Sequence, residues 1–163
     1  MTRAAAVVLG AIIAAALAVG LTRPAPSPRH APPLPRNALA GTPVTLTLLG
    51  GRPALIDFFA SWCGPCSTEA SAVERAARAL RGRAHVAAVD WSDSPRYALQ
   101  FITHHGWTFP VLSDPNGVTG NAYGIEGLPT AFVLDARGRV VKRLLGPQTV
   151  STLVHAVAES SVH

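Results

Sequence analysis

The most informative part of the chain is residues 54–66, which read Ala-Leu-Ile-Asp-Phe-Phe-Ala-Ser-Trp-Cys-Gly-Pro-Cys. Its first seven residues are apolar except for Asp57, a pattern typical of a central strand that is covered on both faces. After the cysteines, apolar residues recur every three or four positions as far as Leu80, which predicts an amphipathic helix. The sequence therefore predicts a strand, a tight turn and a helix, with Cys63 and Cys66 at the start of the helix.

Strands and helices alternate through the rest of the chain, which ends in a hairpin and a helix. We expect strands at residues 43–49, 85–90, 111–112, 130–134 and 140–145, and helices at residues 94–105 and 149–158. The first of these strands alternates Val and Leu with Thr, so we expect it to be half-buried. This order of elements predicts an α/β fold with a mixed central sheet flanked by helices.

The N-terminal 39 residues differ in composition from this domain. Residues 4–21 carry no charge, and a helix of that length spans roughly 27 Å, close to the hydrocarbon core of a membrane. We interpret residues 1–22 as a signal anchor, with a cleaved signal peptide as the alternative. Residues 23–39 contain six prolines and predict an extended linker without a core of its own. The globular domain is expected over residues 40–163.

Charge argues against nucleic-acid binding. The formal net charge is +5, but four arginines lie before residue 40, where there is no acidic residue. From residue 40 onward, ten basic residues face nine acidic ones, so the predicted domain is nearly neutral. Since such a domain has no basic surface for a polyphosphate, we expect no nucleic-acid partner.

The two cysteines have the spacing that disulfide exchange needs. The unpaired N–H groups and the dipole at a helix N-terminus stabilise a thiolate at Cys63. Cys66 lies one turn later, where its thiol can resolve a mixed disulfide. Gly64 permits a tight loop, and Pro65 fits the first helical turn because its missing N–H is not needed there.

Two other interpretations of the cysteines are weaker. A zinc site needs four ligands, and the remaining ones would have to come from scattered histidines such as His85, His104 or His105. His104 and His105 are adjacent at the end of a predicted helix, a position that favours contact with the helix dipole over metal ligation. A merely structural disulfide across so short a ring would stabilise the fold little. We therefore expect neither a metal nor any cofactor apart from the cysteine pair itself.

Asp57 is the second candidate catalytic residue. It interrupts an apolar strand six positions before Cys63, where loss of hydration raises the pKa of a carboxyl group. A carboxylate of raised pKa could take the proton from Cys66 as that thiol attacks. The alternative is an aspartate at a strand edge that faces water.

Residues 57–66 resemble the active-site segment of thioredoxin-fold proteins, and residues 40–158 resemble the membrane-tethered branch represented by TlpA and ResA. Residues 89–111 are similar to the insertion that marks this branch. The resemblance implies a cis-proline loop facing the cysteines, matched here by Gly-Leu-Pro-Thr at residues 127–130, in which the residue before the proline pairs with substrate. The substrate-contacting residues expected on this basis are Trp62, Gly64, Pro65, Leu128 and Pro129.

Two residues have an open interpretation. Trp62 packs beside the site or is an ordinary core aromatic residue. Some relatives of the TlpA type carry a buried acid in the insertion, and Asp93 is the candidate here, although it is shorter than the acid of those relatives.

The expected function is reduction of protein disulfides outside the cytosol, with apocytochrome c as a candidate substrate. The dipeptide Gly64-Pro65 is the one found in thioredoxins, which implies a reducing pair. Such a protein, expected as a monomer, must be recharged by a membrane electron carrier, because it has no further cysteines. A disulfide-forming oxidase and a binding module without turnover are the alternatives. A peroxidase is disfavoured because that family pattern has Thr where Ala60 stands.

Overall fold

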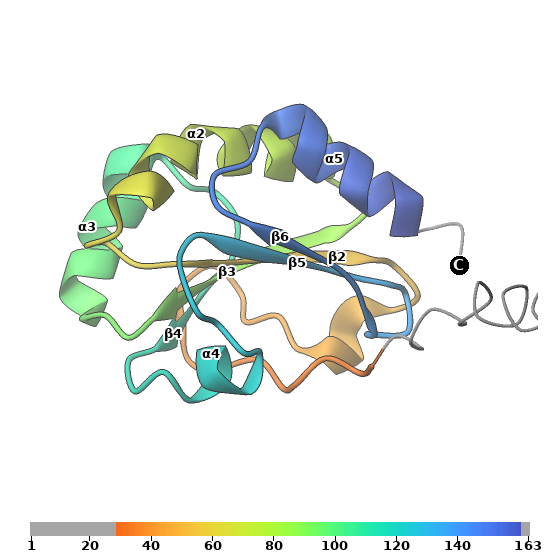
Figure 1. Ribbon diagram of the computed structural model, residues 1–163, viewed down its shortest axis with the longest axis horizontal. Helices are drawn as coiled ribbons and strands as arrows, with labels where there is room; N and C mark the ends of the chain where they lie inside the picture. Colours follow the sequence, from red (N-terminus) through yellow and green to blue (C-terminus); the bar gives the residue numbers. More distant parts are fainter. Residues whose placement is uncertain (1–28, 161–163) are drawn as a thin grey trace, which may run out of the picture.

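The computed structural model describes residues 29–160, which form a mixed sheet between two covering layers (Figure 1). Within these residues the sheet has six strands in the order β1-β4-β3-β2-β5-β6. The strands are β1 (Ala38–Ala40), β2 (Ala54–Phe59), β3 (His85–Trp91), β4 (Val111–Asp114), β5 (Thr130–Leu134) and β6 (Val140–Leu145). The predicted α/β class with a mixed sheet is confirmed.

Strand β2 lies at the centre of the sheet. It pairs in parallel with β3 and antiparallel with β5, and all six of its residues are buried. Parallel pairing of β3 with β4 extends the sheet on one side, and the β5–β6 hairpin extends it on the other. The continuous apolar run that predicted a doubly covered strand is thus explained by its place in the sheet.

Helices cover the two faces of the sheet unequally. The helical segments are η1 (Leu46–Leu49), α2 (Gly64–Ala79), α3 (Pro95–His105), α4 (Val118–Ala122) and α5 (Val150–Glu159). Figure 1 shows α2, α3 and α5 together on one face, while the short α4 and the orange turn η1 lie on the other. The predicted helices after the cysteines, after Ser94 and at the end of the domain are confirmed, whereas α4 and β1 were not predicted.

The expected strand at residues 43–49 is wrong, because Leu46–Leu49 form the 3-10 turn η1 and none of this segment pairs with the sheet. The turn ends at Gly50, whose φ of 54° is a left-handed conformation that glycine adopts readily. Val44 and Leu49 are buried in the second core cluster, on the face that α4 is too short to cover. The alternating pattern correctly predicted that one side of this segment is buried. The buried side packs against a face of the sheet, however, and the segment does not pair with an edge strand.

Part of the expected linker at residues 23–39 also differs from the structure. From residue 29 onward it is packed on the domain: Ala31 and Leu34 belong to the second core cluster, and the Tyr123 hydroxyl donates to the Pro32 carbonyl at 2.8 Å. Residues 38–40 form β1, which pairs antiparallel with β4. Proline favours an extended backbone, and here that backbone lays apolar side chains against the open face of the sheet.

The expected anchor or signal peptide at residues 1–22 lies outside the described residues. Between residues 29 and 160, no helix is both long and apolar enough to cross a membrane.

Replacement of Leu34 by Ala tests whether the segment before β1 belongs to the folded unit. Leu34 is buried, so we expect Leu34→Ala to lower the free energy of unfolding by about 2 to 3 kcal/mol in urea titrations. The matched control is Arg36→Ala, an exposed position where the change should stay within about 0.5 kcal/mol. Equal stability of the two variants would show that the segment contributes nothing to the core.

Candidate active site around the Cys63–Cys66 disulfide

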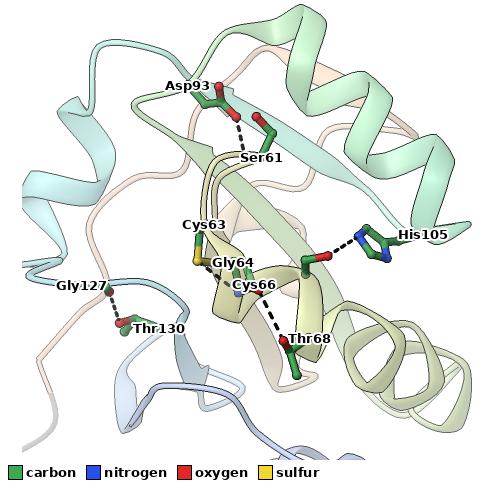
Figure 2. Close-up of a disulfide and its surroundings, with 10 residues drawn as sticks. Ser61, Cys63, Gly64, Cys66, Thr68, Asp93, His105, Gly127 and Thr130 are labelled. Carbon is green, nitrogen blue, oxygen red and sulfur yellow. Dashed lines mark hydrogen bonds between the residues drawn. A yellow bond between two sulfur atoms is a disulfide. The ribbon is translucent and has the colours of Figure 1, made fainter.

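Cys63 and Cys66 form a disulfide at the N-terminus of α2, with an S–S distance of 2.05 Å (Figure 2). Cys63 is the N-cap residue, and its sulfur accepts a hydrogen bond from the backbone N–H of Cys66 at 3.1 Å. Pro65 lies in the first helical turn, as its missing donor allows. The predicted placement of both cysteines is confirmed, and an N–H group of the helix terminus already points at the Cys63 sulfur.

The loop at residues 127–129, directly before β5, lies beside the cysteines. The Leu128–Pro129 peptide bond is cis, as the resemblance implied, and Leu128 packs against the core cluster that contains both cysteines. The Thr130 hydroxyl donates to the Gly127 carbonyl at 2.7 Å and closes the loop, which Figure 2 shows next to the disulfide. A surface hollow of about 260 Å³ adjoins it, lined among others by Glu126, Leu128, Pro129, Arg143 and Leu145.

Trp62 is a surface residue, so its interpretation as a core aromatic residue is wrong. Its side chain is 60% exposed directly before Cys63. The indole N–H donates to the Ser92 carbonyl at 3.3 Å, which ties the ring to the loop that follows β3. An exposed aromatic ring held in one place is suited to contact another molecule.

Asp57 is buried in the middle of β2, so the alternative of an aspartate facing water is wrong. It is 2% exposed, and its Oδ1 atom has no hydrogen-bond partner among residues 29–160. Burial raises the pKa of its carboxyl group well above the ordinary value, and the nearby charge of Glu69 raises it further. The expected rise in the Asp57 pKa is thus explained chiefly by desolvation.

Glu69 is a second buried acid near the cysteines that was not predicted. It is 3% exposed; its Oε1 atom accepts a hydrogen bond from the backbone N–H of Gln148, and its Oε2 atom has no partner within the described residues. Burial raises its pKa to about 7, against the lowering effect of that hydrogen bond. Its spacing is a signal that could have revealed it, because residue 69 is one helical turn beyond Cys66.

Asp93 joins the loop after β3 to the loop that precedes Cys63. Its Oδ2 atom accepts a hydrogen bond from the backbone N–H of Ser61, and its Oδ1 atom accepts one from that of Ser94, each at 2.6 Å. Its 9% exposure agrees with the expectation of a buried acid in this part of the chain. The Asp93 side chain thus contacts the backbone of the active-site loop and not a cysteine.

The three histidines do not come together. His85 is the first residue of β3, where its ring lies 3.1 Å from the Leu49 carbonyl, whereas His104 and His105 are the last two residues of α3. The His105 ring lies 3.1 Å from the Ser67 hydroxyl, and burial, helped by His104, lowers its pKa. Among residues 29–160, no group of three or more His, Cys, Asp or Glu side chains could hold a metal ion.

A helix-capping Cys-Gly-Pro-Cys disulfide beside a cis-proline loop, on a mixed sheet covered by helices, defines a protein of the thioredoxin-like class. Comparison with known proteins is more specific. The chain belongs to the AhpC/TSA family, whose family model matches residues 28–143.

The sequence relatives are named for thiol–disulfide chemistry. The chain is 31% identical to the thiol:disulfide interchange protein HelX of Rhodobacter capsulatus over 68% of its own length and 61% of HelX. It is 28% identical to the thiol-disulfide oxidoreductase ResA of Bacillus anthracis, over 77% of this chain and 73% of ResA. The chain thus spans about three fifths of the length of HelX and about three quarters of the length of ResA.

A solved structure supports the fold. The thiol:disulfide interchange protein of Chlorobium tepidum superposes with a TM-score of 0.70 at 24% identity, covering 84% of this chain and 99% of that one. At this identity the match concerns the fold alone.

Replacement of Glu69 by Gln tests its raised pKa. An acid whose pKa is higher in the folded than in the unfolded protein binds more protons when folded, so stability falls as the pH rises from 4.5 to about 7. We expect Glu69→Gln to remove about 2 to 3 kcal/mol of this loss in the oxidised protein, measured by urea unfolding across that range. The buried carboxyl groups of Asp57 and Asp90, whose pKa values are also raised, leave a pH dependence of their own in the variant. An unchanged pH dependence would contradict the raised pKa.

Proposed function

We propose that this protein is an extracytoplasmic thiol–disulfide oxidoreductase that reduces disulfides in other proteins. The observation that carries the proposal is the Cys63–Cys66 pair at the N-terminus of α2, with a helix N–H directed at the Cys63 sulfur. The names of the sequence relatives support the same chemistry. A peroxidase is disfavoured by Ala60, a fully buried residue without a hydroxyl group.

The reaction begins from the reduced protein. The Cys63 thiolate attacks a substrate disulfide, forming a Cys63–substrate disulfide and releasing one substrate thiolate. Cys66 then loses its proton and attacks the Cys63 sulfur, which forms the Cys63–Cys66 disulfide and releases the second substrate thiolate. Two electrons pass from the cysteine pair to the substrate. The helix N-terminus stabilises the Cys63 thiolate before attack and again when that sulfur is displaced during recharging.

Asp57 is the proton acceptor for Cys66 in this proposal. A buried carboxylate with an unpartnered oxygen is a stronger base than an exposed one, since a proton relieves the cost of its desolvation. Glu69, the second buried acid, acts on the Asp57 pKa through its charge. The Asp57 carboxylate therefore takes up a proton more readily while Glu69 is ionised than when Glu69 is protonated.

Substrate binds across the surface formed by Trp62 and the cis-proline loop. Trp62 is exposed, and the hollow beside Leu128 and Pro129 can take one side chain of an extended peptide. The backbone of Leu128 pairs with that peptide, and Gly64 and Pro65 leave room for it over the cysteines. Apocytochrome c is the candidate substrate that the resemblance suggests.

Electrons reach the pair from a membrane electron carrier in this proposal, and residues 1–22 anchor the domain or serve as a cleaved leader. The uncharged run at residues 4–21 supports this location. The dipeptide Gly64-Pro65 favours reduction over disulfide formation.

The equilibrium of the full-length protein with a glutathione redox buffer tests the direction of reaction. A reductase should give a reduction potential near the value of about −270 mV typical of thioredoxin, whereas a strong disulfide donor lies near about −120 mV. Cys63→Ser is the control and should exchange no disulfide. If cells that carry Cys63→Ser have the same phenotype as cells with the unaltered protein, the protein is a binding module and the proposal is wrong.

Replacement of Asp57 by Asn tests the proton acceptor. We expect Asp57→Asn to slow resolution of the mixed disulfide by about 100-fold at pH 7, because Cys66 then loses its proton to water alone. Attack by Cys63, followed separately by stopped-flow mixing with a model disulfide, should change little. Resolution as fast as in the unaltered protein would exclude Asp57 from this role.

A further inference from the structure

Asp90 is a buried carboxyl group that the proposed reaction does not use. It is fully buried on β3, and neither of its carboxyl oxygens has a hydrogen-bond partner among the described residues. It lies in register with Phe59, the last residue of β2, and with Ser113 of β4. Asp90 is therefore level with the point where β2 ends and the loop to Cys63 begins.

Two hydrogen bonds hold this loop to the segment that follows β3. The Ser61 backbone N–H donates to Asp93, and the Trp62 indole N–H donates to the Ser92 carbonyl. We call this pair of hydrogen bonds the loop clasp; Figure 2 shows its Asp93–Ser61 half above Cys63. Ser92 has a φ of 52°, a left-handed conformation that is unfavourable for serine, so the clasp holds a strained segment.

The charged groups that act on Asp90 all have its own sign. They are Asp93, on the loop after β3, and Asp114, at the end of β4, whose Oδ2 atom accepts a hydrogen bond from the Gly120 N–H. The register partners on β2 and β4 are not ionisable, and α4 contains no ionisable residue. Burial, followed by these two carboxylates, raises the pKa of Asp90 to about 8, so Asp90 is neutral at pH 7.

A neutral Asp90 is compatible with the carboxylate of Asp93, whereas an ionised Asp90 is not. Two adjacent carboxylates in a poorly hydrated site repel each other strongly. Asp93 lies on the loop after β3 at 9% exposure, whereas Asp90 is 0% exposed and is held within β3 by the pairing of that strand with β2 and β4. The group that moves on ionisation is therefore Asp93, which accepts the Ser61 hydrogen bond of the clasp.

We propose that the proton on Asp90 keeps the active-site loop clasped, and that its loss to water releases Ser61 from Asp93. Asp90 is thus a positioning residue for Cys63, which follows Ser61 by two residues. Its effect on disulfide exchange rests on the proposed function, but the opening of the clasp does not.

The test is an NMR titration of the oxidised full-length protein from pH 6 to 9.5, in which the cysteines do not titrate. The Ser61 and Ser94 amide signals should move together in one step with a midpoint near 8. Asp90→Asn, which has the same shape and can donate to Asp93 but cannot ionise, should abolish the step. Asp114→Asn should keep the step at a lower midpoint, because it removes one of the charges that raise the Asp90 pKa.

Two results would overturn the proposal. One is a titration of the unaltered protein in which the Ser61 amide does not move; the other is a step that persists in Asp90→Asn. Glu69→Gln and Asp57→Asn backgrounds remove the two other buried carboxyl groups whose pKa is raised by burial. The titration of the unaltered protein needs no variant. It can therefore refute the proposal even if Asp90→Asn does not fold.

A kinetic measurement separates this proposal from the proposed function. One pH unit above its pKa, about nine tenths of Asp90 is ionised, so the clasped fraction falls roughly tenfold. The rate of Cys63 attack on a model disulfide should be the same for Asp90→Asn and the unaltered protein at pH 7, and several-fold higher for the variant at pH 9. An NMR step without any disulfide exchange would refute the function and retain the clasp.

Discussion

The burial of β2 on both faces is the constraint on which the rest of the structure depends. Its backbone is fixed by hydrogen bonds to β3 and β5, so the chain leaves the sheet at a defined point after Phe59. Cys63, four residues later, is the N-cap of α2, and its sulfur accepts a hydrogen bond from the Cys66 N–H. Because an apolar strand must be covered on both faces, α2, α3 and α5 pack on one side and the segment around Leu34 and Leu49 on the other.

Five of the seven buried acids among residues 29–160 fall into two kinds, while the other two, Asp93 and Asp114, accept hydrogen bonds from backbone N–H groups. Glu74 and Asp135 have arginine partners, Arg78 and Arg139, and their hydrogen bonds lower the carboxyl pKa despite burial. Asp57, Glu69 and Asp90 have unpartnered oxygens, and burial raises their pKa. An unpaired buried carboxyl group destabilises a fold, so its presence is better explained by proton chemistry than by stability. Asp57 lies on β2, Glu69 lies on α2 with Cys66, and Asp90 lies on β3, which pairs with β2.

Much of the site follows from local sequence. The continuous apolar run predicted β2, and the helical spacing after Cys66 predicted α2, because each pattern reports burial within a single element. The alternation at residues 43–49 misled, since a one-sided segment can lie beneath a sheet as well as at its edge. The proline-rich segment misled in a similar way: its backbone is extended as expected, but Leu34 and its neighbours are part of the core.

The sequence by itself determined the cysteine pair, its place at a helix N-terminus and the acid in the preceding strand, because a capped helix and a buried strand are set by neighbouring residues. The tertiary structure alone decided that Glu69 and Asp90 are desolvated, that Trp62 is exposed, and that Asp93 holds the loop before Cys63. Hydration of a side chain depends on what packs around it, and those neighbours come from distant parts of the chain. A pattern of adjacent residues does not contain that information.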